Sequence, residues 1–342
     1  MNKRRILFFV VSLVYVFTAQ AQNGKDVYLD MNAPRHERIL DLLSKLTIEE
    51  KISLLRATSP GIPRLHIDKY YHGNEALHGV VRPGNFTVFP QAIGLAAMWN
   101  PQLLNEISTV ISDEARARWN ELEQGKKQLG QFSDLLTFWS PTVNMARDPR
   151  WGRTPETYGE DPFLSGKLGV SFVKGLQGDD PRYLKIVSTP KHFAANSQEL
   201  RRMANDSVVD ERTFREIYTT GFEIAIKEGK SKSIMSSYNE VNGVYANENS
   251  HMLQEILVDE WGFDGFVVSD WGGSNDHALG VKNGSHLEMP GTGKSGMYDI
   301  IHAVENGDLD EAVLDQRLDE LLNVIFSTHQ ATEDAKGKTF DV

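Results

Sequence analysis

The sequence has no cysteine among its 342 residues. Disulfide bonds, cysteine zinc sites, thiol catalysis and a lipidated N-terminal cysteine are therefore excluded together. Positive charge is also scarce relative to negative charge, because 36 Lys and Arg residues face 47 Asp and Glu residues and the formal charge is −11. Phosphate binding needs a basic face, so this balance argues against nucleic acid as a partner.

Motifs for cofactors and metals are missing as well. No Gly-x-Gly-x-x-Gly follows an expected strand, and no complete Gly-x-x-x-x-Gly-Lys-Ser/Thr loop occurs. The histidines lack the spacing of metal ligands. We therefore expect neither a cofactor nor a metal.

Long apolar runs are confined to the N-terminus, where residues 1–21 have the pattern of a signal peptide. Three basic residues precede the apolar stretch from Ile6 to Val16, and Ala19-Gln20-Ala21 supplies a cleavage site. Cleavage would lower the formal charge from −11 by three, to −14. The alternative is an uncleaved membrane anchor. We expect a periplasmic or secreted bacterial protein with no membrane contact after cleavage.

Short apolar runs alternate with helical stretches in the second half of the chain. The runs are Leu136–Ser140, Tyr183–Ser188, Ser233–Ser237 and Gly265–Ser269, and the helical stretches are Leu164–Gly175, Asp210–Glu228 and Asn249–Trp261. Helices are also expected over Glu37–Leu55, Pro101–Trp119 and Glu311–Phe326. Within the first of these stretches, Thr47-Ile48-Glu49-Glu50 has a capping-box pattern and predicts the start of a second helix. This rhythm predicts parallel strands surrounded by helices, a (β/α)₈ TIM-type barrel spanning residues 22–330. From Thr328 the chain turns polar, which predicts a linker.

The sharpest motif follows the last apolar run, where Asp270 comes directly after a buried strand and before Trp271 and two glycines. A carboxylate at that point can attack the anomeric carbon of a sugar or bind a cation, and the indole can stack on a sugar ring. The alternative is an aspartate that caps the next helix. Lys191 and His192 also follow an apolar run and can donate hydrogen bonds to hydroxyls, although a solvated strand end would look the same.

Two loops carry further charged side chains. Arg147, Arg150 and Arg153 lie within seven residues, and guanidinium groups suit vicinal hydroxyls or carboxylates. Glu75 follows the aromatic pair Tyr70-Tyr71, where a carboxylate can accept hydrogen bonds from two hydroxyls. Either loop can also be purely structural.

Taken together, these motifs resemble glycoside hydrolase family 3, the exo-acting β-glucosidases and β-xylosidases. The matching stretches fall in family order from about Arg35 to Phe326: Leu77-His78-Gly79, Phe89-Pro90-Gln91, Arg147–Arg153, Tyr158–Asp161, Lys191–Ala194, Ser236–Asn239, Gly265–Gly272 and Leu287–Pro290.

The resemblance implies a barrel whose pocket holds one terminal β-linked sugar of an oligosaccharide or aryl β-glycoside, without a cofactor. Asp270 is implied as the nucleophile of a retaining double displacement. The implied sugar contacts come from Arg153, Lys191 and His192, with Met235 and Tyr238 lining the pocket, Trp271 forming the wall at the leaving group and Glu75 standing where many β-glucosidases carry Asp.

The chain departs from the family pattern in its general acid. That acid usually lies in a second α/β domain after the barrel, to which residues 331–342 would begin the linker. Single-domain relatives carry a histidine on the loop after Lys-His instead, and the corresponding loop here, 196–202, has none. We therefore expect slow hydrolysis of ordinary glycosides by this chain alone, with the acid supplied by a missing domain or a partner chain.

A second departure is that the two halves resemble different branches of the family. Up to about Pro162 the chain resembles the xylosidase type, and from about Arg201 the glucosidase type, so a recombined gene with its boundary near Lys191 is an alternative. The longer side chain of Glu75 favours xylose over glucose by about 1–3 kcal/mol. Residues around Asp270 favour glucose, and we expect a slight preference for glucosides. The rival reading is a catalytically silent sugar-binding fragment.

Overall fold

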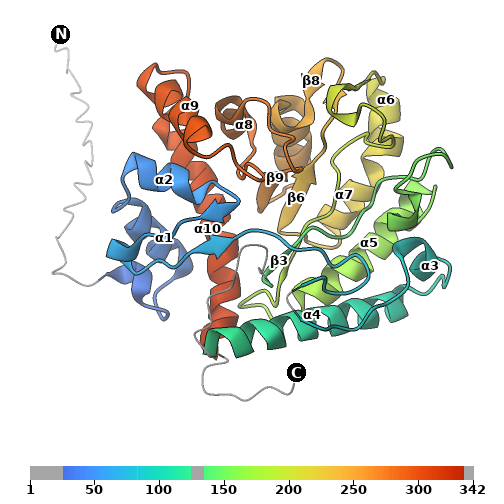
Figure 1. The fold of residues 1–342 in the computed structure, drawn as a ribbon, viewed down its shortest axis with the longest axis horizontal. Helices are drawn as coiled ribbons and strands as arrows, with labels where there is room; N and C mark the ends of the chain where they lie inside the picture. The colour runs from blue at the N-terminus through green and yellow to red at the C-terminus, as the bar shows by residue number, and fades with distance from the viewer. Residues whose placement is uncertain (1–25, 83, 125–134, 335–342) are drawn as a thin grey trace, which may run out of the picture.

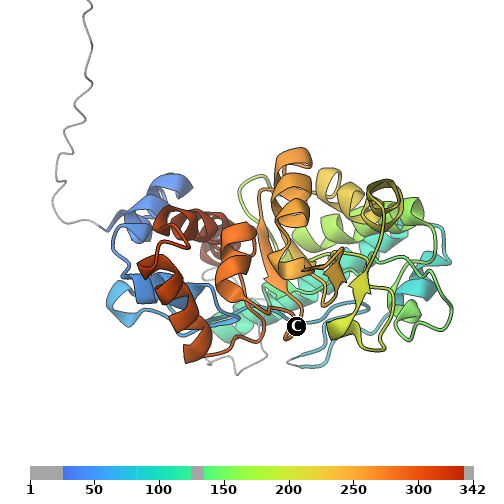
Figure 2. The same ribbon diagram turned by 90° about the horizontal axis from the view of Figure 1, so that it is seen from above.

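A computed structural model of the chain describes residues 26–82, 84–124 and 135–334. The expected signal peptide, residues 1–21, and residues 335–342 lie outside the described residues. Short strands lie at the centre of the molecule, and helices surround them (Figures 1 and 2). None of the described helices combines the length and the apolar composition needed to cross a membrane.

The helices have the following bounds: α1 (Arg35–Leu43), α2 (Ile48–Leu54), α3 (Ala92–Ala96), α4 (Pro101–Gln124), α5 (Pro162–Gln177), α6 (Glu211–Thr213), α7 (Thr220–Lys227), α8 (His277–Asn283), α9 (Lys294–Glu305) and α10 (Glu311–Asp334). Two segments have π-helical hydrogen bonding, η5 (Phe214–Tyr218) and η7 (His251–Glu260). The strands are β1 (Thr58–Ser59), β2 (Tyr70–Tyr71), β3 (Thr137–Phe138), β4 (Val187–Ser188), β5 (Asp206–Ser207), β6 (Ser233–Ser236), β7 (Glu240–Val241), β8 (Val244–Tyr245) and β9 (Phe266–Ser269).

The described strands form four small sheets, so the expected mixed α/β class with parallel pairing is present but a closed eight-stranded barrel is not. β3 pairs with β4, β5 with β7 and β6 with β9, all in parallel. β1–β2 and β7–β8 are antiparallel, contrary to the expectation of parallel strands alone. The connections explain the difference: parallel pairing needs a crossover of a dozen or more residues, and β7 and β8 are joined by a tight turn at Asn242-Gly243, both at positive φ.

Backbone hydrogen bonds connect the sheets to one another. The N–H groups donate across successive segments as follows: Asn74 to Thr137 O, Val187 to Leu136 O, Phe193 to Met235 O, Asp270 to Ser236 O, Ser269 to Leu287 O and Ala57 to Glu288 O. The ends of these extended segments are thereby held close to one another. The polar residues that follow the parallel strands consequently gather at one edge.

The stretch expected to be helical over Glu37–Leu55 forms α1 and α2, and the second helix begins after Thr47 as expected. Thr47 and Glu50 form the expected capping box at the start of α2, with Glu50 N–H donating to Thr47 Oγ1 at 3.3 Å and Thr47 N–H to Glu50 Oε2 at 2.9 Å. This reciprocal pair satisfies two backbone donors that the helix itself leaves unpaired.

The helix was expected to end at about Phe326 and a linker to begin at Thr328. This boundary is wrong, because α10 continues to Asp334. The hydroxyl groups of Ser327 and Thr328 donate to the carbonyls of Val324 and Ile325, at 2.5 and 2.7 Å. Both residues are buried. Polar residues at these positions therefore satisfy their hydrogen bonds within the helix and do not end it.

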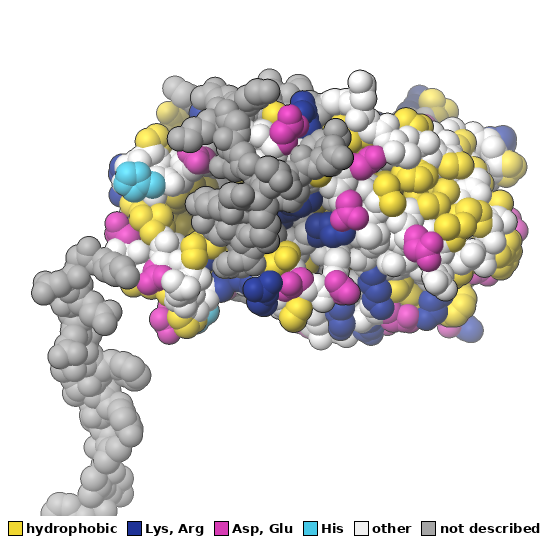
Figure 3. Space-filling model, turned by 90° about the horizontal axis from the view of Figure 1, so that it is seen from below, with side chains coloured by type: hydrophobic (Ala, Val, Ile, Leu, Met, Phe, Trp, Pro, Cys, Tyr) yellow, Lys and Arg dark blue, Asp and Glu magenta, His cyan; other side chains and the backbone are white. Residues whose placement is uncertain are grey.

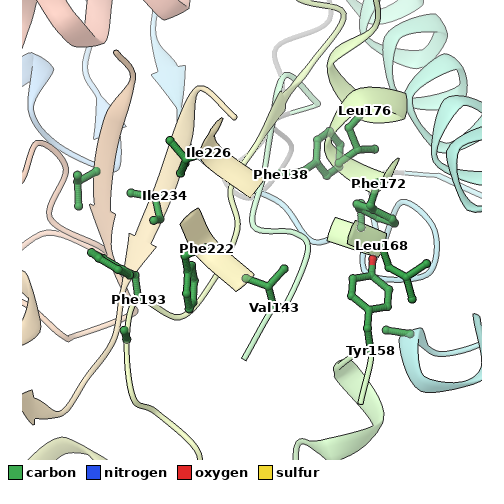
Figure 4. Close-up of a cluster of buried hydrophobic side chains, with 14 of the residues drawn as sticks. Phe138, Val143, Tyr158, Leu168, Phe172, Leu176, Phe193, Phe222, Ile226 and Ile234 are labelled. Atoms are coloured by element: carbon green, nitrogen blue, oxygen red, sulfur yellow. The ribbon is translucent and has the colours of Figure 1, made fainter. Parts of the chain in front are cut away.

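Two clusters of buried apolar side chains form the core. One includes side chains of α4, α5 and α7, where Phe222 contacts Phe193 edge-on with ring centroids 5.2 Å apart (Figure 4). The other includes side chains of α1, α2, α10 and β9. α5 and α7 pack closely, since a Cβ at Gly166 would lie 2.8 Å from Ile224 Cδ1. Each cluster contains side chains from both halves that the sequence assigns to different branches, such as Ala76 and Phe222 in the first and Ile39 and Val268 in the second.

The surface carries charges of both signs. On the face drawn in Figure 3, acidic and basic side chains are interspersed, and hydrophobic side chains gather toward one end. Many of the exposed charges pair within a helix, as Arg212 does with Glu216. Such exposed pairs contribute little to stability.

A buried polar network joins β9 to α10, and its loss should destabilise the protein. The Val267 N–H donates to His286 Nδ1 at 3.0 Å, and His286 Nε2 lies 2.8 Å from a Glu320 oxygen that also accepts from Arg317. His286→Ala would leave the buried Val267 N–H without its acceptor and would remove one hydrogen-bond partner of the Glu320 carboxylate. We expect the free energy of unfolding in urea to fall by about 2–4 kcal/mol.

The matched control is His251→Ala. His251 also contacts two carboxylates, those of Glu211 and Glu255, but its side chain is 43% exposed. Its loss should cost less than about 1 kcal/mol. Equal losses in the two variants would contradict the role assigned to the buried network.

Candidate active site

A cavity of about 300 Å³ lies at the edge where the central segments end. Its lining combines carboxylates, cationic groups and aromatic rings: Glu75, Arg82, Trp139, Arg153, Lys191, His192, Met235, Ser269, Asp270, Trp271 and Met289. The site residues expected from the sequence are all in this lining except Tyr238.

The fold brings these side chains together from distant parts of the sequence. Asp270 and Trp271 directly follow β9, and Met235 lies within the neighbouring strand β6. Lys191 and His192 follow β4. Because parallel neighbouring strands end at the same edge of a sheet, residues just beyond them meet.

Asp270 has one occupied and one unpartnered carboxylate oxygen. The Trp271 N–H donates to Oδ1 at 2.7 Å, while Oδ2 is buried and has no hydrogen-bond partner among the described residues. Burial raises the pKa of this carboxyl group, and the Trp271 N–H and the charge of Lys191 offset only part of the rise. One oxygen is thus held by the backbone, and the other keeps its full capacity to accept a hydrogen bond.

His192 is buried against Asp270 and held by Asn144. Asn144 Nδ2 donates to His192 O at 2.9 Å, and Asn144 Oδ1 accepts from the His192 N–H at 2.6 Å, so the amide orientation is defined. The same Oδ1 lies 2.9 Å from His192 Nδ1, which must therefore be the protonated ring nitrogen.

The second ring nitrogen of His192, Nε2, lies 3.6 Å from Asp270 Oδ2. Burial and the positive charges of Arg153 and Lys191 lower the pKa of His192 well below its usual value. The ring is therefore neutral, and the 3.6 Å approach is not an ion pair. Nε2 is left as an acceptor, which a sugar hydroxyl can satisfy.

Lys191 and Glu75 form a close ion pair in the cavity wall. The Nζ group lies 2.8 and 3.0 Å from the two carboxylate oxygens, and the Lys191 side chain is only 2% exposed. Burial raises the pKa of Glu75, and the ammonium group offsets part of this effect. An ammonium and a carboxylate side by side can donate to one sugar hydroxyl and accept from another.

Of the three clustered arginines, the structure places only Arg153 in the cavity. Its guanidinium donates to both oxygens of Glu156, at 2.9 and 2.8 Å, which fixes its direction. Arg150 pairs with Asp148 on the surface, and Arg147 donates to the Tyr218 hydroxyl at 2.6 Å. The latter two arginines therefore have structural partners away from the cavity.

Trp271 lies at the mouth of the cavity and is 40% exposed, with Trp139 against it at a centroid distance of 6.0 Å. Tyr238, which was expected beside the nucleophile, lies next to Asp270 but not in the cavity lining given above. Its ring is buried and its hydroxyl donates to the Trp271 carbonyl at 2.8 Å, because a buried phenol needs an acceptor, and the ring thereby supports the Trp271 backbone.

Sequence reasoning missed four lining residues: Arg82, Trp139, Ser269 and Met289. Trp139 had a signal in the sequence, because it lies near the end of the apolar run Leu136–Ser140. Met289 lies within the matching stretch Leu287–Pro290, but an apolar side chain in a cavity wall cannot be told from a core residue by its type alone.

The chemistry of this lining is that of a carbohydrate site. Hydrogen-bond donors and acceptors surround a carboxylate with one oxygen to spare, and indole rings provide apolar faces for a sugar ring. No group of three or more His, Asp or Glu side chains within the described ranges is placed to hold a metal ion. The arrangement has the donors, acceptors and apolar faces that binding a sugar requires, together with a candidate nucleophile.

Comparison with known proteins identifies the family. Residues 64–324 match the model of the glycosyl hydrolase family 3 N-terminal domain, and the chain belongs to this family. It is 40% identical over 292 residues to a xylan 1,4-β-xylosidase of Xylanibacter ruminicola and 36% identical over 303 residues to thermostable β-glucosidase B of Acetivibrio thermocellus. Each alignment covers 84% of this chain.

Solved structures of both kinds of relative share the fold. A family 3 exo-β-xylosidase in complex with a xylobiose aziridine activity-based probe superposes with a TM-score of 0.79 at 30% identity, covering 91% of this chain and 42% of its own. β-Glucosidase 3B of Thermotoga neapolitana in complex with glycerol gives a TM-score of 0.75 at 32% identity, covering 86% and 43%. The chain spans only about a third of the two curated relatives, 34% and 38% of their lengths.

Proposed function

We propose that this chain carries the sugar-binding pocket and nucleophile of a retaining exo-β-glycosidase that removes terminal non-reducing β-linked glucose or xylose from oligosaccharides. The observation that carries the proposal is the carboxylate of Asp270, which lines a cavity of donors and aromatic rings and has one oxygen, Oδ2, without a hydrogen-bond partner among the described residues. The relatives, named as β-xylosidases and β-glucosidases, support it.

The proposed reaction proceeds in two displacements at the anomeric carbon. Asp270 Oδ2 attacks that carbon, the bond to the leaving oxygen breaks, and the oxygen takes up a proton to leave as an alcohol. Water then attacks the same carbon, releasing the sugar and regenerating the carboxylate. His192, Lys191 and Glu75 hold the hydroxyls, and Trp271 faces the leaving group.

For the fold, we propose that the central segments represent an irregular (β/α)₈-type barrel spanning residues 22–330. The chain of backbone hydrogen bonds from one segment to the next, and from Ala57 to Glu288, supports it. The antiparallel pair β1–β2 would be one departure from the regular form.

We propose that the proton for the leaving oxygen comes from outside this cavity, from a further domain or a partner chain. Among the described lining residues the carboxylates are Asp270 and Glu75, and Glu75 accepts from Lys191 with both oxygens. This observation also supports the second candidate, a sugar-binding protein without turnover.

We also propose export to the periplasm or the medium, on the pattern of residues 1–21. For the sugar, Glu75 favours xylose and the residues around Asp270 favour glucose, with a slight preference for glucosides. Both sugars therefore belong in the test.

The test is intact mass spectrometry after incubation with 2-deoxy-2-fluoro β-glycosides that carry a dinitrophenyl leaving group. This leaving group departs without a proton, so the source of the acid does not affect the result. The glucosyl and xylosyl reagents are compared side by side. A stable adduct supports the enzyme and its mass identifies the sugar, whereas a folded chain that gives no adduct would leave the sugar-binding candidate.

The pH dependence of this reaction should follow Asp270. Its pKa is raised by burial, so the nucleophile becomes protonated, and kcat/KM for a dinitrophenyl β-glycoside falls, at a pH above that of an ordinary aspartate, whose pKa is about 3.9. His192 is neutral over this range because its pKa is lowered. The measurement is kcat/KM from about pH 4 to 8.

Glu75, whose pKa is also raised, provides the control. The fall in kcat/KM at acidic pH should persist in Glu75→Gln, because that variant retains Asp270. If kcat/KM of Glu75→Gln did not fall at acidic pH, the fall in the parent would be due to protonation of Glu75 and not of Asp270.

A further inference from the structure

Glu248 is a buried carboxylate outside the cavity with no place in the reaction proposed above. It ends the short 3₁₀ turn η6 (Ala246–Glu248) and is 4% exposed. One carboxylate oxygen, Oε1, accepts from two consecutive backbone N–H groups, those of Asn275 at 2.8 Å and Asp276 at 3.1 Å. The other, Oε2, is buried without a hydrogen-bond partner among the described residues.

The two N–H groups belong to the loop 271–276, which begins at Trp271. Residues in or next to the cavity hold the first half of this loop: the Trp271 carbonyl accepts from Tyr238, the Gly272 N–H donates to Met289 O at 2.6 Å, and the Gly273 N–H donates to Asp270 O at 2.8 Å. Glu248 holds the second half. Asp276 then caps α8 by accepting from the Leu279 N–H at 2.9 Å.

Glu248 is itself fixed to the central strands. The preceding residue, Asn247, accepts with its Oδ1 from the hydroxyls of Ser236, in β6, and Ser285, both at 2.9 Å. Asn283 Nδ2 donates to the Glu248 carbonyl at 2.7 Å. The carboxylate therefore connects the loop to the strand that neighbours β9, and it does so with a charged acceptor, which forms stronger hydrogen bonds than a neutral one.

We propose that Glu248 is a positioning residue that holds the loop 271–276 and so sets the position of Trp271 as the wall facing the leaving group. The kinetic effect of Glu248 that we expect rests on the proposed function, because it requires an active enzyme. The effect on the position of the loop rests on the hydrogen bonds described above. A displaced Trp271 side chain should lower kcat/KM for substrates whose leaving group contains a ring that contacts it. It should have little effect on kcat/KM for substrates whose leaving group is a single atom.

The kinetic test compares a dinitrophenyl β-glycoside with the β-glycosyl fluoride of the same sugar. Glu248→Ala should lower kcat/KM for the dinitrophenyl substrate by about 10- to 100-fold more than for the fluoride, and Trp271→Ala should show the same selectivity. Glu248→Gln keeps an acceptor oxygen for both N–H groups and should stay within about threefold of the parent.

The matched control is Glu320→Ala. Glu320 is also a carboxylate that accepts several hydrogen bonds, but from His286, Arg317 and Gln316, away from the loop. Its loss should lower stability and affect both substrates equally. An equal effect of Glu248→Ala on the two substrates would overturn the positioning role.

A readout independent of turnover separates this inference from the proposed function. The chain is labelled with 5-fluorotryptophan, and the Trp271 ¹⁹F resonance is assigned with Trp271→Phe. Glu248→Ala should shift or broaden that resonance, while Glu248→Gln and Glu320→Ala leave it in place. An unchanged resonance in Glu248→Ala overturns the inference even if the parent enzyme is active, and a changed one supports it even if the parent is inactive.

Discussion

Replacement of Asp270 by alanine is expected to lower kcat for a dinitrophenyl β-glycoside by about 10⁴- to 10⁶-fold, the range typical of removing a nucleophile. The same change should abolish the adduct with 2-deoxy-2-fluoro glycosides. The physical reason is that Asp270 is the carboxylate of the described cavity lining that keeps an oxygen without a hydrogen-bond partner, while both oxygens of the other lining carboxylate, Glu75, accept from Lys191.

Rescue with azide distinguishes a nucleophile from a residue that only supports the fold. In Asp270→Ala a small anion fits the space of the lost carboxylate and can attack the anomeric carbon, with dinitrophenolate leaving. The product is a glycosyl azide of inverted, α configuration, because only one displacement occurs. Turnover in Asp270→Ala without azide, at the parent rate, would contradict the assignment.

Asp270→Asn addresses the sugar-binding candidate. Asparagine retains the shape of the side chain and an acceptor at Oδ1 for the Trp271 N–H, but is a poor nucleophile. A binding protein should keep its sugar affinity in this variant, and its parent should show no adduct. An enzyme should lose turnover and keep much of its affinity.

The sequence predicts the polar residues at strand ends well because two local signals coincide there. A short apolar run predicts a buried strand, and the first polar side chains after it must lie at the edge of the sheet. Asp270, Lys191 and His192 were found in this way, and the structure places all three in one cavity.

Other features depend on contacts between residues far apart in the chain. Lys191 and Glu75 are separated by 116 positions, and nothing local to either residue indicates that they pair. α10 continues past Thr328 because the hydroxyl groups of Ser327 and Thr328 donate hydrogen bonds to backbone carbonyls one turn earlier in the helix. The choice of Arg153 over Arg147 and Arg150 came from the motif around it, since the three arginines are equivalent in residue type.

The Lys191–Glu75 pair predicts a second large effect, which separates stability from activity. Lys191→Met removes the cation that pairs with the Glu75 carboxylate, whose side chain is 34% exposed and keeps some contact with water, and we expect the free energy of unfolding at pH 7 to fall by about 1–2 kcal/mol. Activity should fall by about 10²- to 10³-fold, because a charged donor to the sugar is lost as well.

The double variant Lys191→Met/Glu75→Gln removes both charges and completes a double-mutant cycle. Stability should recover most of its loss, since no uncompensated charge remains, whereas kcat/KM should stay low because the ammonium group is still missing. Recovery of activity together with stability would show that Lys191 acts through the fold alone.

The pH dependence of the free energy of unfolding of Lys191→Met tests whether the Glu75 carboxylate causes its loss of stability. Burial already raises the pKa of Glu75 in the parent, and loss of the ammonium group removes an effect that lowers it. The folded variant therefore binds a proton at Glu75 more readily than the unfolded chain, and its stability deficit should shrink as the pH falls through that raised pKa. Because Glu75→Gln has no carboxyl group at this position, the stability of the double variant should lack this component of the pH dependence, and urea unfolding of parent, single and double variants at about pH 5 and 7 measures the difference.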